Sequence, residues 1–495
     1  MTKEFNLWED AANPPGDVQQ QLQQLMTDCR NRGADYADAR FMVLRREVYA
    51  TKNASVSRAD MEVRRGLGLR VLLGGRWGFA AAPGLPVDDP GLVQQALDMA
   101  RAASMTPSPP VELRPRAPET GTYVSPRRID PSTITPQQKI ALLLETDEIM
   151  AGRNEIRTRQ GRLEFYYVDK WYADTEGSAT RQSIIESGAG ITALAVGEGD
   201  AQVRTYPSLM GDAQQAGWEF ILEQDLPGHA SRTAEEAVAL LTAPECPSGE
   251  LDVILTGSLL ALQVHESCGH PSELDRVMGV EADVAGTSFL TLDGLGNRQY
   301  GSPAVTLTAD ATVPGGLGTF GWDDEGTPAQ RIVLVDEGVH RGYLTSRQYV
   351  TNPDQPSGGN ARCDNWARPP IVRMTNINLE PGSGTLDDLI ADTGHGYLFN
   401  GEKTWSIDDR RLNFAIGAQV GWEIVDGKLG RLMKNPGYTG ITPQVWGSCD
   451  AVAGPEAWRV WGLTGCGKGA PMQNLHVGHG VSPARFRGLK VGVRS

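Results

Sequence analysis

The sequence lacks the features that would place the protein in a membrane or on nucleic acid. No apolar run among its 495 residues approaches the roughly 20 residues that a membrane-spanning helix needs. Residues 1–15 are polar and acidic and contain no apolar signal core. The formal net charge is −15, and no long Lys/Arg run interrupts it. This balance argues against nucleic acid or an anionic membrane as the main partner, and we expect a soluble cytoplasmic protein.

Cysteine and histidine are both scarce. Six cysteines are scattered along the chain, which excludes a disulfide framework and leaves thiols, one or two of which could bind metal. Only seven histidines are present. Two of them bracket the segment H-E-S-C-G-H at 265–270, and Glu266 follows the first directly. Imidazoles bind zinc well, and a neighbouring carboxylate can take a proton from metal-bound water.

The length favours at least two domains, because single cores rarely grow past roughly 250–300 residues. We predict an α+β fold with an α/β N-terminal domain over residues 1–243. A mostly antiparallel, β-rich domain over residues 244–495 would carry the motif on a short helix. The segment around 106–136 is dense in proline and lacks periodicity, which indicates an extended connection or a flexible insertion.

Periodicity and turn residues predict the elements of each domain. In the first domain, Gly74-Gly75 is a good hairpin turn. The capping box from Thr233 to Glu236 predicts the start of a helix that ends near 243. Further helices are predicted over 18–29, 92–103 and 137–150, and strands over 41–50, 67–73, 76–81 and within 156–195. Strands of the second domain are predicted over 251–255, 304–307, 332–335 and 411–420.

The motif differs from the usual zinc-protease pattern H-E-x-x-H, whose histidines lie four residues apart on one helical face. Five steps of roughly 100° rotate a side chain by about 140° from its partner. We predict a helix capped by Ser258 whose last turn carries His265. Gly269 and Pro271 should end this helix, so that His270 can swing back towards the first histidine. The alternative is a pair of ordinary surface or core histidines.

A catalytic zinc site usually has three protein ligands and one open position, so a further donor is needed. Cys466 ranks first, because flanking glycines let the backbone approach closely and nearby Lys468 would favour a thiolate. His479 ranks second and Glu273 third. Cys268, inside the motif, is better interpreted as a small buried apolar residue.

Several separated motifs show that the chain resembles the TldD/PmbA family of modulators and metallopeptidases, in particular its TldD-like, zinc-motif-bearing branch. Together they are more specific than any one of them. The matching segments are a hairpin at 66–79, H-E-x-x-x-H at 265–270, D-D-E-G-T-P at 323–328, R-M-T-N at 373–376 and C-G-K at 466–468.

The resemblance implies a zinc-dependent peptidase. Zn²⁺ would be bound by His265, His270 and Cys466, with Glu266 as the general base and a zinc-bound water as the nucleophile. The family fold is an α/β N-terminal domain followed by a β-rich domain. Members form dimers, either with a TldE/PmbA-like subunit or with themselves, and cleave unfolded or leader-type peptides in an enclosed space between subunits. Some members mature peptide natural products.

The chain departs from the family in two places. Thr404-Trp405-Ser406 stands where many members have a Gly-Gly pair, and the tail at 476–483 differs from the usual ending. These departures concern substrate range and pairing mode, and they leave the zinc-binding set intact.

Other polar groups are candidates for contact with the substrate, namely Asp323, Asp324, Glu325, Arg373, Asn376 and His479. The three acidic residues could orient a substrate amine or a ligand histidine, or form an acidic surface turn. The arginine and the asparagine could shape the cleft or belong to a structural turn. The run at 408–411 is expected to be a solvated charge run. Core or interface aromatics are expected at Trp322, Trp366, Trp405, Trp446 and Trp461.

Two other functions fit parts of the sequence. The first is a non-catalytic, PmbA/TldE-like scaffold subunit that completes a partner's chamber, against which the intact ligand set argues. The second is a zinc hydrolase that acts on a non-peptide substrate. For the peptidase, we expect an extended peptide to be held partly by addition to an exposed sheet edge, with little sequence preference.

Overall fold

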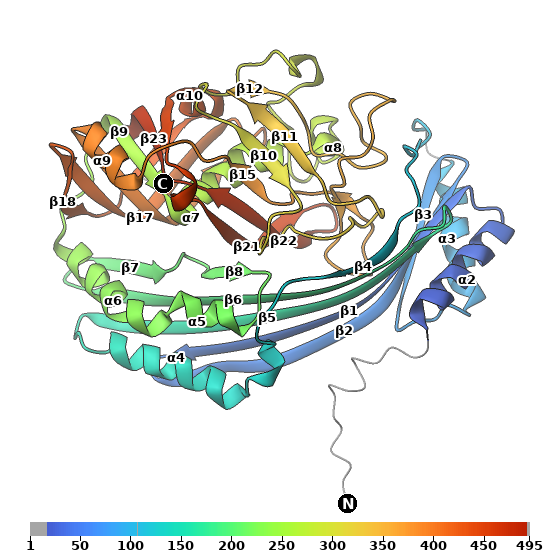
Figure 1. Cartoon of the computed structure of the whole chain (residues 1–495), viewed down its shortest axis with the longest axis horizontal. Helices are drawn as coiled ribbons and strands as arrows, with labels where there is room; N and C mark the ends of the chain where they lie inside the picture. The colour runs from blue at the N-terminus through green and yellow to red at the C-terminus, as the bar shows by residue number, and fades with distance from the viewer. Residues whose placement is uncertain (1–16, 106, 493–495) are drawn as a thin grey trace, which may run out of the picture.

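A long, curved, mostly antiparallel sheet with a β-rich body above it makes up the molecule (Figure 1). The structure is a computed structural model that describes residues 17–105 and 107–492. The N-terminal half forms the sheet and the helices on it, and the C-terminal half forms the body, which lies over the concave side of the sheet. This α+β architecture, an α/β region followed by a mostly antiparallel β-rich region, confirms the predicted fold class.

The long sheet has the strand order β3-β2-β1-β5-β6-β4, and β7 and β8 also pair with β6. The predicted hairpin at Gly74-Gly75 joins β2 to β3. Both glycines have positive φ, +58° and +71°, a conformation that glycine adopts without steric cost. The strands are β1 (Tyr36–Lys52), β2 (Ser55–Leu73), β3 (Arg76–Pro83), β4 (Thr120–Val124), β5 (Ile156–Asp174), β6 (Ala179–Val196), β7 (Ala201–Tyr206) and β8 (Asp212–Gln214).

The proline-rich segment around 106–136 is an extended connection that the sheet partly orders. Within it, β4 pairs in parallel with β6, and a 3₁₀ turn at Pro131–Thr133 precedes the next helix. Of the two alternatives that its composition left open, the extended connection within the first domain fits the structure.

Helices cover the side of the sheet that faces away from the body, in two groups (Figure 1). Helices α2 (Val18–Asn31) and α3 (Pro90–Ala103) pack at one end, where they share an apolar cluster with β1, β2 and β3. Helices α4 (Pro136–Met150), α5 (Trp218–Gln224) and α6 (Leu226–Thr242) cover the other end over a second cluster. The predicted apolar stripe of α2 and its Asp17 cap are confirmed.

The predicted start of α6 at the capping box is wrong. The helix begins at Leu226, where Asp225 is the cap and accepts a hydrogen bond from the backbone N–H of Gly228. Thr233 lies within the helix and donates from its hydroxyl to the carbonyl of His229. A Thr-x-x-Glu pattern is equally compatible with a helix interior, so the stronger Asp-Leu-Pro start upstream determines the boundary.

The β-rich body contains a seven-stranded sheet with the order β16-β9-β23-β19-β17-β18, in which β20 also pairs with β23. All of its pairings are antiparallel except that of β16 with β9. Its strands are β9 (Gly249–Thr256), β16 (Gly396–Ile407), β17 (Asn413–Val425), β18 (Lys428–Met433), β19 (Gly437–Ile441), β20 (Cys449–Val452) and β23 (Ala484–Val491).

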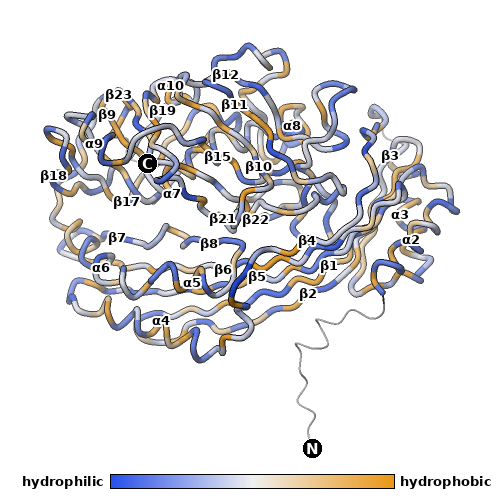
Figure 2. Tube along the Cα trace, viewed as in Figure 1, coloured by the Kyte–Doolittle hydropathy of each residue, from blue (hydrophilic) through white to orange (hydrophobic). Residues whose placement is uncertain are grey.

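Apolar segments occur both in the body and along the long sheet (Figure 2). Three smaller sheets complete the body. They consist of β10 (Leu307–Asp310), β11 (Arg331–Asp336), β12 (Val339–His340) and β15 (Ile377–Leu379), of β13 (Ala361–Arg362) and β14 (Ile371–Val372), and of β21 (Arg459–Lys468) and β22 (Gln473–Val481). The helices of this half are α7 (Gly257–Val264), α8 (Leu274–Val277), α9 (Leu386–Thr393) and α10 (Thr442–Gly447).

Strand predictions in this half vary in accuracy. The predicted strands at 251–255 and 332–335 lie inside β9 and β11, whereas the one at 304–307 meets β10 only at Leu307. The strand predicted from 411 begins at Asn413, because Arg411 is in a left-handed turn with φ +60°. Within the described part of the chain, no helix is long and apolar enough to cross a membrane.

Candidate metal centre

The H-E-x-x-x-H motif lies where α7 changes into a π-helical turn, His265–Gly269. Residues 258–264 of α7 are all buried, as expected for a mostly apolar helix. The helix cap is Thr256, and the Ser258 hydroxyl donates instead to a carboxylate oxygen of Glu402. The predicted Ser258 cap is therefore wrong, although the helix that it was to start is present.

The π-helical turn accommodates the five-residue spacing of the histidines. The backbone N–H of His270 donates to the carbonyl of His265, an i→i+5 bond that widens the helix so that both side chains share one face. His270 keeps helical angles, φ −61° and ψ −44°, so its predicted release from the helix is wrong. The predicted proximity is nevertheless correct, because the two ring centroids lie 4.9 Å apart.

Gly269 is the last residue of the π-helical turn, and it also meets a packing requirement. A Cβ at this position would lie 2.2 Å from the sulfur of Met374, which is far inside van der Waals contact. The chain continues from Gly269 into a 3₁₀ turn, His270–Ser272, with Pro271 in its first turn. Because proline lacks an N–H, it is tolerated at such a start.

Cys466 reaches the two histidines from β21, nearly two hundred residues further along the chain. The β21–β22 pairing shifts register between Leu463 and Cys466, a bulge of the kind that re-aims a side chain. The Cys466 sulfur lies 3.7 Å from Nε2 of His270. One donor atom from each of His265, His270 and Cys466 lies within 4.8 Å of the others, and the three residues are buried. The structure thus brings the three predicted ligands together.

A chain of hydrogen bonds fixes which nitrogen of His265 faces the cysteine and the second histidine. Nδ1 of His479 lies 3.3 Å from the carbonyl oxygen of Ile377, which can only accept, so this nitrogen carries the proton. Nε2 of His479 therefore accepts from Nδ1 of His265, 2.9 Å away. His265 is left with a lone pair on Nε2, the arrangement of a metal-binding imidazole held by a second hydrogen bond.

Glu273 orients the other histidine. Its Oε2 lies 3.0 Å from Nδ1 of His270, which leaves Nε2 of His270 free beside Cys466. Three cations surround this buried carboxylate: Lys468 at 3.5 Å, Arg276 at 3.8 Å and Arg373 at 3.8 Å. The sequence ranked Glu273 and His479 as possible ligands, and the structure places both directly behind the histidines.

Arg373 holds the cysteine. Its Nη2 donates to the sulfur of Cys466 at 3.0 Å and to the carbonyl of the same residue at 2.5 Å. Burial alone would raise the pKa of the Cys466 thiol, but the guanidinium of Arg373 counteracts burial, and this pKa lies below its usual value. Lys468, which was expected to favour the thiolate, donates instead to Asp275 at 2.6 Å and to the carbonyl of Val372.

Burial also sets the protonation of the histidines. It lowers the pKa of His265 to about 4 and that of His270 well below its ordinary value. Both imidazoles are therefore neutral near pH 7, and each offers a lone pair.

Glu266 is held by an arginine that the sequence did not indicate. Nη1 of Arg411 donates to Oε2 of Glu266 at 2.5 Å, and the two side chains are 19% and 10% exposed. The left-handed turn at Arg411 follows Asp408, whose carboxylate accepts from the backbone N–H groups of Leu412 and Asn413. The expectation of a solvated charge run is therefore wrong for Arg411, and the sequence of two acidic and two basic residues at 408–411 gave no signal of the contact.

The donors open into a cavity of about 210 Å³. His265, Glu266 and His270 line one part of it together with Cys466 and Arg411. Apolar lining residues come from β16, β21 and the loop between β7 and β8, namely Met210, Trp405, Trp461 and Leu463. Polar lining residues are Ser208, Ser258, Glu402 and His479.

The acidic cluster joins the body to the long sheet. Lys170 pairs with Asp324 at 2.5 Å and Arg70 pairs with Glu325 at 3.1 Å, while Asp323 accepts from three backbone N–H groups, among them that of Ala361. All three acidic residues are buried, so the surface-turn alternative is wrong. Asn376, another candidate, accepts from the Gly318 N–H and supports the loop around it.

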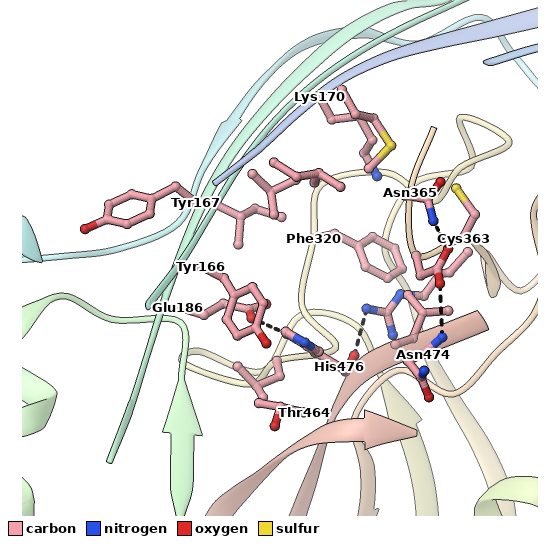
Figure 3. Close-up of a pocket in the computed structure, with 18 of the residues that line it drawn as sticks. Tyr166, Tyr167, Lys170, Glu186, Phe320, Cys363, Asn365, Thr464, Asn474 and His476 are labelled. Carbon is pink, nitrogen blue, oxygen red and sulfur yellow. Dashed lines mark hydrogen bonds and ion pairs between the residues drawn. The ribbon is translucent and has the colours of Figure 1, made fainter. Parts of the chain in front are cut away.

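A larger cavity of about 630 Å³ lies between the long sheet and the body (Figure 3). Figure 3 shows His476 directed at Glu186, with which its Nδ1 forms a hydrogen bond, beside the ring of Tyr166. Thr464 and Gly465, in the bulge before the cysteine, line this cavity, and Gly465 lines the metal pocket as well. The larger cavity therefore adjoins the candidate metal centre without containing it.

The donor set fits zinc. Two neutral imidazoles and a stabilised thiolate are ligands that zinc prefers, and a catalytic site uses three of them and leaves one position open. Zinc bonds of about 2.1 and 2.3 Å at a tetrahedral angle span about 3.6 Å, close to the 3.7 Å between Nε2 of His270 and the sulfur of Cys466. The orienting contacts behind each histidine match those of known metal sites.

Family models identify the class to which this fold and site belong. The C-terminal domain of the PmbA/TldA metallopeptidases matches residues 248–492, their central domain matches 129–241, and their domain 1 matches 37–104. The matches cover most of the chain, and the chain belongs to the TldD/PmbA family of metallopeptidases.

Individual relatives agree with this assignment. A metalloprotease of Methanocaldococcus jannaschii is 26% identical over 84% of this chain and 89% of its own length. A metalloprotease TldD homolog of Buchnera aphidicola is 25% identical over 94% of each chain. A crystal structure of TldE from Thermococcus kodakarensis superposes with a TM-score of 0.74 at 16% identity and covers 96% of this chain and all of its own, which shows a shared fold.

Proposed function

We propose that the protein is a zinc-dependent peptidase in which His265, His270 and Cys466 hold the metal and Glu266 is the general base. The observation that carries this proposal is the convergence of these three donors, with Glu266 on the same π-helical turn. When bound, zinc would lower the pKa of a coordinated water and polarise the scissile carbonyl.

The side chains of the pocket transfer the proton and hold the reacting groups in position. Glu266 takes the proton of the attacking water and delivers it to the leaving amine. Arg411 keeps this carboxylate in position in the pocket, since it donates to Oε2. His479 and Glu273 keep Nδ1 of each ligand histidine engaged, so that Nε2 remains available.

The exposed end of strand β16, beside the pocket, supports an extended peptide as the substrate. Strand β16 pairs with β9 through residues 397–400, and beyond these its described pairing is with β17 alone, up to Ile407. Trp405, on this stretch, lines the metal pocket. A peptide could add to this edge through main-chain hydrogen bonds, and the adjoining 630 Å³ cavity has room for further residues. Unfolded or leader-type peptides have the exposed backbone that this binding mode needs.

Metal content and cleavage test the proposal. We expect about one zinc per chain by elemental analysis of the purified protein, and a loss of zinc in His265→Ala. His395, whose side chain is 75% exposed, provides the control His395→Ala, which should keep its metal. Glu266→Gln should keep zinc and lose peptide cleavage.

Each outcome excludes one alternative. Near-zero zinc content in the unmutated protein would overturn the proposed peptidase function and favour a scaffold subunit. Undiminished cleavage by Glu266→Gln would remove Glu266 from the mechanism. Zinc without cleavage of any peptide would favour a hydrolase with a non-peptide substrate.

We further propose that the active form is a dimer with a TldE/PmbA-like subunit or with a second copy of this chain. The fold shared with TldE supports this assembly. Co-purification with the product of a neighbouring TldE-like gene, compared with light scattering of the protein alone, distinguishes the two. A monomer that cleaves peptides at full rate would overturn both.

A further inference from the structure

Part of the wall of the metal pocket is apolar and open to solvent. Met210 is 53% exposed and Trp405 is 41% exposed, and both line the 210 Å³ cavity with Trp461. Side chains of this size are usually well covered in a folded chain. Two exposed apolar side chains in the cavity that contains the donor set form a binding surface, because displacement of water from them is favourable.

Three separate segments bring these side chains together. Trp405 lies on the part of β16 that extends beyond its pairing with β9. Met210 lies in the loop between β7 and β8, and Trp461 on β21, five residues before Cys466. The guanidinium of Arg459 lies over the Trp461 ring, 4.4 Å from its centroid, which favours a fixed ring position.

The charges of the pocket are already paired. Glu266 and Arg411 bind each other. Glu402, the other carboxylate among the described lining residues, accepts from the Ser258 hydroxyl and from the backbone N–H of Leu209. A charged substrate side chain would therefore lose its water without finding a free partner, which is costly.

We infer that Met210, Trp405 and Trp461 form a subsite that selects a bulky, uncharged side chain next to the scissile bond, so that the preferred substrates are peptides with an aromatic or large aliphatic residue at that position. The inference rests on the proposed peptidase function and narrows its substrate class. The cavity of 210 Å³ is below the roughly 300–1,000 Å³ of sites for drug-sized ligands, which suits a single residue. The rest of the peptide would extend past Gly465 towards the larger cavity.

The test uses one peptide sequence in which a single position is Phe, Leu, Ala, Asp or Lys. Cleavage sites are mapped by mass spectrometry, kcat/KM is measured for each peptide with the zinc-loaded protein, and affinity is measured by fluorescence anisotropy with Glu266→Gln. We expect Phe and Leu to exceed Ala by about 10- to 200-fold in kcat/KM, with Asp and Lys lower still. Trp405→Ala should reduce the Phe-to-Ala ratio at least tenfold.

Controls separate the subsite from general damage. Met210→Ala, on a different segment, should lower the same ratio by a smaller factor, and it serves as the test if Trp405→Ala does not fold. Leu429→Ala removes an apolar side chain that is 49% exposed on β18 and should leave the ratio unchanged. A ratio that neither pocket variant alters, or an equal loss for all five peptides, would overturn the inference.

The two readouts distinguish failure of the subsite from failure of the peptidase. If Glu266→Gln binds the Phe peptide selectively through Trp405 but the unmutated protein cleaves nothing, the subsite stands and the peptidase function falls. If cleavage occurs without side-chain selection, the peptidase stands and the subsite falls.

Discussion

Arg411 and Glu266 form an ion pair at the mouth of the metal pocket, with Nη1 of the arginine 2.5 Å from Oε2 of the glutamate. The arginine belongs to a left-handed turn on the seven-stranded sheet, and the glutamate to the π-helical turn that carries both histidines. A general base must be aimed at the proton that it takes, and this contact fixes the position of the carboxylate. The pair therefore links the sheet edge to the chemistry proposed for the centre.

Removal of Arg411 should slow catalysis without loss of metal. In Arg411→Met, Glu266 keeps its place in the chain but loses its orienting cation, so we expect kcat to fall by about 10- to 100-fold, less than the full contribution of a general base. Arg411→Lys should restore part of the rate. Arg410 is exposed, so Arg410→Met is the control. Equal kcat in Arg411→Met and Arg410→Met would show that the contact is incidental.

Replacement of Glu273 should weaken metal binding. Glu273→Gln keeps the shape of the side chain but removes the carboxylate that accepts from Nδ1 of His270, and we expect the zinc affinity to fall by about 10- to 100-fold. Competition with a chelator measures the affinity. Asp275→Asn removes a neighbouring charge that pairs with Lys468 without this histidine contact. An equal loss in the two variants would mean that total charge, and not orientation, is responsible.

The contact between the sheet and the body should depend on the buried pair Lys170–Asp324. Lys170→Met leaves Asp324, 3% exposed, without its nearest cation, and we expect a destabilisation of about 3–5 kcal/mol. Asp324→Leu combined with Lys170→Met should recover much of it, because no charge is then left unpaired. Thermal unfolding of the two singles and the double forms a mutant cycle. Arg58→Met, at an exposed ion pair, should change the melting temperature little, and a similar small change for Lys170→Met would contradict the prediction.

His340 should make the protein sensitive to acid. Burial lowers the pKa of His340 to about 4 in the folded protein, whereas the unfolded chain has a pKa near 6.5. As the pH falls from about 6.5 to 4, the unfolded state takes up a proton that the folded state does not, so the free energy of unfolding should fall by about 3 kcal/mol. The stability from this residue is complete above pH 6.5.

Denaturation at several pH values checks this expectation. His340→Gln keeps a donor for the carbonyl of Gly342 but does not titrate, so its stability should vary less over this range. His395→Gln, at an exposed histidine, should follow the unmutated protein. A His340→Gln protein with the same slope would assign the acid sensitivity to other groups.

The sequence correctly predicted those elements that depend on one strong local signal. The α2 stripe and the Gly74-Gly75 turn were correct, because each depends on residues that are neighbours in the chain. The start of α6 and the strand at 304–307 were wrong. A Thr-x-x-Glu pattern can also lie inside a helix. A short apolar run does not by itself determine which of its residues pair with a neighbouring strand.

The candidate metal centre shows the same difference between what local sequence predicts and what the fold decides. Motif order identified His265, Glu266, His270 and Cys466, and the structure gathers them. The π-helical turn was missed, because Gly269 and Pro271 look like a helix end, whereas the close approach of Met374 requires the glycine. Trp405 was expected among core or interface aromatics, and it lies exposed in the pocket.

The sequence by itself determined the inventory of this protein: an α+β chain with two imidazoles, a thiol and a carboxylate in the order of its family. Only the tertiary structure decided how those groups are held. Arg373 faces Cys466, His479 faces His265, and Arg411 faces Glu266 across 93, 214 and 145 residues of chain. Contacts at such separations depend on how sheets and loops pack around the pocket, and no local pattern of residue types encodes them.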